Sequence, residues 1–180
     1  MRVPEQTPFQ LLCAWEARVR EVGRTLPRSE ARPEARWTGI GFFVGDERLV
    51  VPMEQVLEIG HLPRLTRVPG CKAWLRGMAN LRGRLAAVAD LGGFLTGSNT
   101  VVSPRTRVLE VRDEFVPVGL LVTEMAGLRH FRASQQTANQ GVADWLVPYF
   151  TGRVVDDRGA WTVMDLNRIV RHPAFLHVGL

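Results

Sequence analysis

The chain has 180 residues, 46% of them hydrophobic, so it can bury a real core, and we expect most of it to be ordered. Its apolar runs are far shorter than the ~20 residues that span a bilayer. The net charge is +5, and nearly all of the positive charge comes from arginine, with Lys72 as the only lysine. The arginines are scattered from Arg2 to Arg171 and form no cluster, which argues against a nucleic-acid groove. Cys13 and Cys71 stand alone, and no secretory signal is visible, so we expect free thiols, no disulfide or zinc site, and a cytosolic protein without direct membrane insertion.

Residues 1–36 are predicted to form a helix followed by a linker. Apolar side chains recur there at spacings of three and four, which is the pattern of an amphipathic helix that ends near Pro27. They are Phe9, Leu12, Trp15, Val19, Val22 and Leu26. This apolar stripe needs a partner surface, and the sequence leaves open whether that is the following domain, a second copy or another protein.

From Trp37 the pattern becomes that of short strands. Residues 39–44 and 48–51 flank a Gly-Asp-Glu turn, residues 53–56 suggest one helical turn, residues 57–62 another strand, and residues 71–75 a brief helix. The segment 75–91 then predicts strand, tight turn and strand. Gly83 permits the positive φ that such a turn needs, and Arg82 beside it is held out. Asp90 is expected to cap a short helix that follows.

The remainder of the chain repeats this organisation. Residues 97–105 and 134–141 are predicted as polar loops, and residues 106–111 and 116–122 as strands. Asp165 is expected to cap a final helix that Pro173 ends.

Sequence matches between the two halves indicate an internal duplication. Residues 44–51 match 111–118 at a constant offset, residues 80–83 match 156–159, and residues 88–91 match 163–166 with one residue deleted between the last two pairs. Several matches in the same order predict two copies of one small β unit, spanning about 37–105 and 106–172 within a domain of residues 37–180. Many short strands with glycine turns favour barrels that protect their edges.

No pattern of residues with reactive chemistry stands out. The four histidines lack metal-ligand spacing, and Asp156 and Asp157 suit the turn in which they lie. We therefore expect no enzyme, no cofactor and no metal. Two alternatives stay open: a small β-barrel that binds oligonucleotides, and a hydrolase that pairs His61 or His130 with an aspartate in a pocket.

Four motifs resemble the CheW-like coupling proteins of bacterial chemosensory systems. They are Gly45-Asp46-Glu47, Val56-Leu57-Glu58-Ile59, Val68-Pro69-Gly70, and the run from Gly77 to Arg84 that leads into Val88-Ala89-Asp90-Leu91. The resemblance covers about residues 39–172. The segments 8–12 and 37–42 look more like the family member linked to type IV pili than like the flagellar coupling protein.

The resemblance implies an all-β fold of two SH3-like five-stranded barrels packed together, with an N-terminal amphipathic helix and a short C-terminal helix. It implies a non-catalytic adaptor between a methyl-accepting chemoreceptor's cytoplasmic tip and the regulatory domain of a CheA-type histidine kinase, in a pathway that controls twitching motility. It also implies that Arg82, Val56 and Glu58 are contact residues for receptor or kinase.

Overall fold

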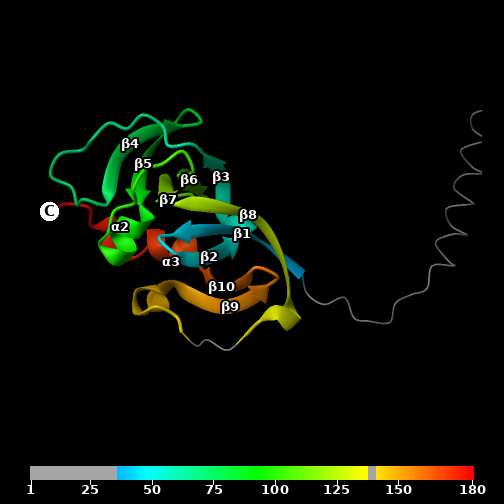
Figure 1. Cartoon of the computed structure of the whole chain (residues 1–180). Coiled ribbons are helices and arrows are strands. Elements are labelled where there is room, and N and C mark those ends of the chain that lie inside the picture. The colour runs from blue at the N-terminus through cyan, green and yellow to red at the C-terminus, as the bar shows by residue number, and fades with distance from the viewer. Residues whose placement is uncertain (1–35, 138–140) are drawn as a thin grey trace, which may run out of the picture. The chain divides into compact units, whose positions relative to one another are not determined.

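The computed structural model describes residues 36–137 and 141–180, which belong to one unit that begins at Ala35 (Figure 1). The predicted N-terminal helix lies outside the described residues. Within the described ranges, no helix has the length and apolar character needed to cross a membrane. The expected mostly-β fold with two groups of five strands is confirmed.

The described strands form two five-stranded sheets. Sheet A has the order β8-β1-β2-β10-β9, and sheet B has the order β3-β6-β7-β5-β4. The strands of sheet A are β1 (Arg36–Val44), β2 (Glu47–Pro52), β8 (Glu124–Arg132), β9 (Phe150–Asp156) and β10 (Gly159–Met164). Those of sheet B are β3 (Val56–Gly60), β4 (Leu75–Leu81), β5 (Arg84–Asp90), β6 (Arg107–Val111) and β7 (Val118–Val122).

The two sheets have the same topology, and each takes strands from both halves of the chain. In sheet A, β1 is antiparallel to β8 and β2 is parallel to β10. In sheet B, β6 is antiparallel to β3 and β7 is parallel to β5. The duplication predicted from the sequence is therefore visible in the strand order. The first hairpin of each copy, however, completes the sheet of the other copy.

The hairpins β4–β5 and β9–β10 match at an offset of 75 residues, and both carry an irregularity at the same place. The pairs next to their turns are Leu81 with Arg84 and Asp156 with Gly159. The match of residues 80–83 with 156–159 was thus wrong by one residue. The counterpart of Arg82 is Asp157, because both turns have two residues and the paired residues of the two hairpins match at one offset through the irregularity.

The main core lies between the sheets and contains side chains of both. Strand alternation places Leu109 and Val111 of sheet B and Ile40 and Phe42 of sheet A in this core. The opposite face of each sheet carries a smaller buried cluster, around Trp161 in sheet A and around Val88 in sheet B. The shared core holds the two sheets together.

Short helices connect the strands. They are η1 (Met53–Gln55), α2 (Leu91–Thr96), η2 (Ala133–Gln135), η3 (Asp144–Tyr149), α3 (Leu166–Val170) and α4 (Pro173–Leu176). Asp90 and Asp165 cap α2 and α3 as predicted. Pro173, which was expected to end the final helix, is instead the first residue of α4, with His172 as its cap. A proline is tolerated at the first position of a helix.

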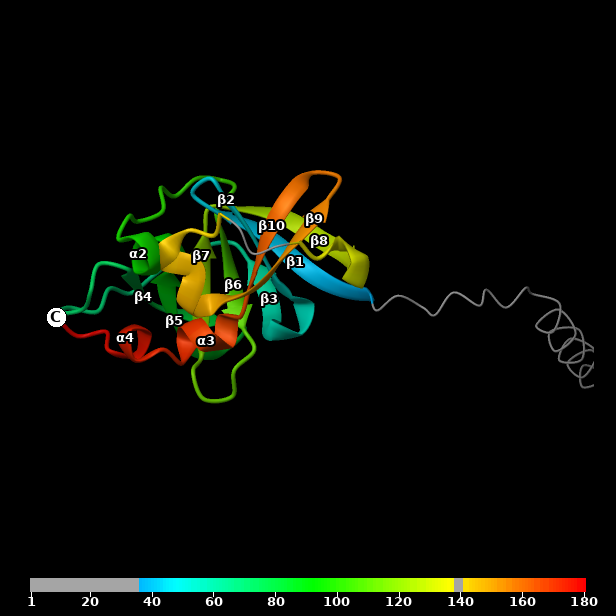
Figure 2. The same cartoon turned by 90° about the horizontal axis from the view of Figure 1, so that it is seen from below.

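Two other segments differ from their prediction. Residues 71–75 form no helix, because the backbone at Cys71 and Lys72 pairs with the C-terminal segment at Gly179 and Val178. Figure 2 shows α4 near β4 and β5, and the ring of Phe175 on α4 stacks on Trp74 at 5.1 Å between centroids.

Strand β7 begins at Val118 instead of residue 116. The Asp113 carboxylate accepts hydrogen bonds from the backbone N–H groups of Phe115 and Val116, which turns the chain before the strand begins. The connection between β6 and β7 is therefore longer than the two-residue turn between β1 and β2.

Candidate functional site

The tip of the β4–β5 hairpin presents Arg82 to solvent. Arg82 has φ of 49° and Gly83 has φ of 83°, the left-handed pair that a two-residue turn between antiparallel strands requires. The Asn80 side-chain oxygen accepts a hydrogen bond from the Gly83 N–H and closes the turn. The Arg82 side chain is 71% exposed. Its predicted place on the turn is thus confirmed.

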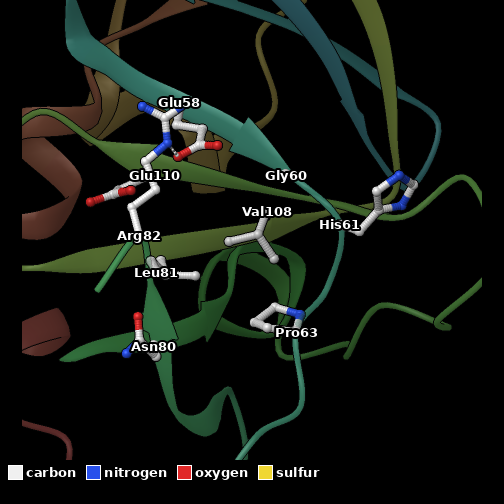
Figure 3. Close-up of a pocket in the computed structure, with 9 residues that line it drawn as sticks. All are labelled: Glu58, Gly60, His61, Pro63, Asn80, Leu81, Arg82, Val108 and Glu110. Carbon is white, nitrogen blue, oxygen red and sulfur yellow. Dashed lines mark ion pairs between the residues drawn. The ribbon is translucent and has the colours of Figure 1, made fainter. Parts of the chain in front are cut away.

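Arg82 forms an ion pair with Glu58 of β3, a strand at the opposite edge of sheet B (Figure 3). An ion pair this exposed contributes about 0–1 kcal/mol, so it does little for stability. It does fix the direction of the guanidinium group, which retains donors for a second acceptor. Two of the three predicted contact residues are therefore brought together by the fold.

Val56, the third predicted contact residue, lies at the start of β3 and is buried in the core. Its register partner is Val111 on β6. In this arrangement the Val56 side chain supports the strand that carries Glu58, and it presents no surface of its own.

A pocket of about 180 Å³ lies beside the Arg82–Glu58 pair (Figure 3). Its walls come from β3 and the segment after it, from the β4 end of the hairpin, and from β6. The lining residues are Glu58, Gly60, His61, Pro63, Asn80, Leu81, Arg82, Val108 and Glu110. The pocket thus combines apolar walls with two carboxylates and one guanidinium.

Glu110 is the residue of this pocket that the sequence analysis missed. It lies directly opposite Glu58 in the antiparallel β3–β6 pair and is buried. Within residues 36–137 and 141–180, its carboxylate makes no hydrogen bond or ion pair. A glutamate between the apolar residues Leu109 and Val111 was the available signal, but only the fold shows that it is buried and that it lines a pocket together with the hairpin tip.

The pocket does not assemble the groups that the hydrolase alternative requires. His61 lines it together with two glutamates and no aspartate. His130 lies elsewhere, with its Nδ1 3.0 Å from the Thr38 hydroxyl. Among the described residues, no three His, Cys, Asp or Glu side chains gather in a way that could hold a metal ion. The arrangement is suited to polar contacts with another molecule.

Comparisons with known proteins give a consistent result. The family model described as the CheW-like domain matches residues 38–174. Protein PilI of Pseudomonas aeruginosa is 35% identical over 175 residues, covering 97% of this chain and 98% of PilI. Protein FrzA of Myxococcus xanthus is 36% identical over 102 residues, covering 56% of this chain and 62% of FrzA.

The fold is also that of a solved member. The crystal structure of scaffolding protein TtCheW from Thermoanaerobacter tengcongensis superposes with a TM-score of 0.68 at 17% identity, covering 78% of this chain and 96% of that chain. At this identity the likeness concerns the fold, and the family model and PilI carry the assignment. The chain therefore belongs to the family of proteins with a CheW-like domain.

Proposed function

We propose that this protein is a non-catalytic adaptor that couples a methyl-accepting chemoreceptor to a CheA-type histidine kinase, in a pathway that controls type IV pilus twitching motility. It would work in the cytoplasm, at membrane-associated receptor arrays. The similarity to PilI along 97% of the chain supports the choice of pathway. Each sheet is proposed to curve into an SH3-like barrel, so that the protein has two separate partner surfaces.

The observation that carries this proposal is the exposed Arg82 guanidinium, held at a rigid turn and oriented by Glu58. A planar group with several fixed donors suits recognition of carboxylates and backbone oxygens on a partner. Val56 is proposed to act indirectly: its buried side chain keeps β3, and therefore Glu58, in place. The second surface is left for the kinase, so one adaptor can hold both partners at once.

The experiment measures binding of the receptor's cytoplasmic tip fragment and of the kinase regulatory domain separately. Arg82→Asn removes the guanidinium but keeps a residue that tolerates positive φ, and Arg82→Glu reverses the charge. We expect receptor affinity to fall about tenfold for the first variant and further for the second, with kinase affinity unchanged.

Arg158→Gln is the matched control, because Arg158 lies exposed in the tip of the equivalent β9–β10 hairpin. It should leave receptor binding at the wild-type value. An unmodified protein that binds neither fragment would refute the adaptor function, and equal losses for Arg82→Asn and Arg158→Gln would refute the role of Arg82.

A further inference from the structure

We propose that the pocket beside Arg82 accepts one basic side chain, a lysine or an arginine, from the receptor segment, with Glu110 as its buried anion. This inference rests on the proposed adaptor function and adds a charged contact to it. It starts from Glu110, which is 5% exposed, is one of the residues that line the pocket, and has no hydrogen bond or ion pair within the described part of the chain. Its oxygens are not among the fully buried polar atoms that lack a partner, so they reach the solvent of the pocket, where a cation can pair with them.

The charges around the pocket do not balance. Glu58 and Glu110 lie directly opposite each other on neighbouring strands, an arrangement that is destabilising for like charges. Arg82 pairs with Glu58 and leaves the second carboxylate without a cation. A single positive group in the pocket would neutralise Glu110 and relieve the repulsion between the two glutamates.

The fold itself does not require a carboxylate at this place, as sheet A shows. On β1, next to the edge strand β8, Phe43 precedes Val44 as Glu110 precedes Val111 on β6. The register partner of Phe43 on β8 is also a glutamate, Glu124. The Phe43 ring packs against Trp161 at 6.0 Å between centroids.

At the position that corresponds to Trp161, sheet B has Ala86, 75 residues earlier in the matched hairpins. Sheet A therefore has packed aromatic rings on this face, and sheet B has a buried carboxylate beside a pocket. The difference is local, because the strands around it keep the same order and direction.

The shape of the pocket suits a long basic side chain. Leu81, Val108 and Pro63 supply apolar contact for an aliphatic stem, and Glu58 and Glu110 are the two carboxylates among the lining residues. Lysine and arginine combine these two properties. The pocket is continuous with the Arg82–Glu58 pair, so a receptor segment that meets Arg82 would pass its opening.

The first test compares receptor binding by the full chain and by Glu110→Gln and Glu110→Val variants. We expect both variants to bind the receptor tip fragment about tenfold more weakly, with a shallower dependence on salt, and to bind the kinase regulatory domain as before. Glu47→Gln is the control, because it removes one exposed carboxylate from the β1–β2 turn region of sheet A.

Folding is monitored by thermal denaturation of each free variant. Glu110→Val removes one of two like charges that lie opposite each other on β3 and β6, so this variant should unfold at the same or a higher temperature than the wild type. Weaker receptor binding by a protein that is at least as stable separates a lost contact from a damaged fold.

The second test uses ethylguanidinium as a small probe and needs no receptor. Backbone amide signals of Gly60 and Glu110 should shift saturably in the wild type and not in Glu110→Gln. Wild-type binding to the receptor with unchanged affinity in both Glu110 variants would overturn this inference and leave the adaptor function standing. Failure of the wild type to bind either fragment would instead overturn the adaptor function.

Discussion

Asp90 and Asp165 occupy equivalent positions in the two sheets, each just after a hairpin and each capping the helix that follows. Asp90 Oδ1 accepts a hydrogen bond from the Gly93 N–H at 3.1 Å, and Asp165 Oδ1 accepts one from the Asn167 N–H at 2.9 Å. Their surroundings differ. The Asp90 side chain is fully buried, whereas that of Asp165 is 26% exposed.

Replacement of Asp90 by alanine is expected to destabilise the protein more than the same change at Asp165. Asp90 also accepts hydrogen bonds from the backbone and hydroxyl of Thr100, each at 2.8 Å, and from Arg76 at 3.2 Å. Asp90→Ala leaves these donors without a partner in a fully buried site and should cost about 2–4 kcal/mol. Asp165→Ala loses the cap and the hydrogen bond from Gln55 Nε2 in a partly exposed site and should cost about 1–2 kcal/mol. Urea unfolding of the two variants measures the difference, and equal costs would contradict it.

Gly77 is predicted to tolerate no side chain. Its φ is 142°, and a Cβ built there would lie 2.4 Å from the Thr66 carbonyl oxygen. Thr66 is held in place by two backbone hydrogen bonds with Met78, both 2.8 Å long, so it cannot move away cheaply. Gly77→Ala should therefore lower the free energy of unfolding by about 2–4 kcal/mol, measured by urea denaturation.

Gly152 provides the matched control for this change, because it occupies the equivalent position in the β9–β10 hairpin. A Cβ at Gly152 would meet nothing within 4 Å. Gly152→Ala should change stability by no more than about 0.5 kcal/mol. If both variants lost stability equally, the close approach at Thr66 would not be the cause.

Features set by neighbouring residues in the chain were predictable from the sequence. Gly83 at the hairpin tip and the two aspartate caps follow from local backbone chemistry, and the structure has them where the sequence placed them. The resemblance to CheW-like proteins also identified Arg82 and Glu58, which the fold then joins in one ion pair.

Features that depend on pairing between distant segments were not predictable in this way. The exchange of hairpins between the copies cannot be detected in the sequence of either copy. The alternation of buried and exposed residues along a strand is the same whichever strand lies next to it. The place of Glu110 likewise depends on distant segments, since Glu58 of β3 lies opposite it and the hairpin tip lines the same pocket. Val56 illustrates the same limit, since its place in the core is set by Val111 on β6.

The carboxylate of Asp113 predicts how stability depends on pH. Burial alone would raise the pKa of Asp113, but hydrogen bonds from the Phe115 N–H, from Arg171 and from the Val116 N–H outweigh burial and lower the pKa below its usual 3.8. The Phe115 and Arg171 Nε contacts are both 2.8 Å long. In the unfolded chain these contacts are lost, so the ionised carboxylate favours the folded state at every pH above the unfolded value.

The stabilisation by Asp113 is therefore expected to be complete above about pH 5 and to disappear as the pH falls below 3.8 through the lower pKa of the folded state. Asp113→Asn keeps an oxygen acceptor but loses the charge. Urea unfolding between pH 2 and about 6 should show a wild-type advantage over this variant that is constant near neutrality and shrinks in acid. Arg171→Gln should reduce the advantage only in part, because the Arg171 side chain is 60% exposed and the backbone donors remain. Wild-type and Asp113→Asn curves that stay parallel down to the lowest pH would show that this carboxylate has no lowered pKa in the folded protein.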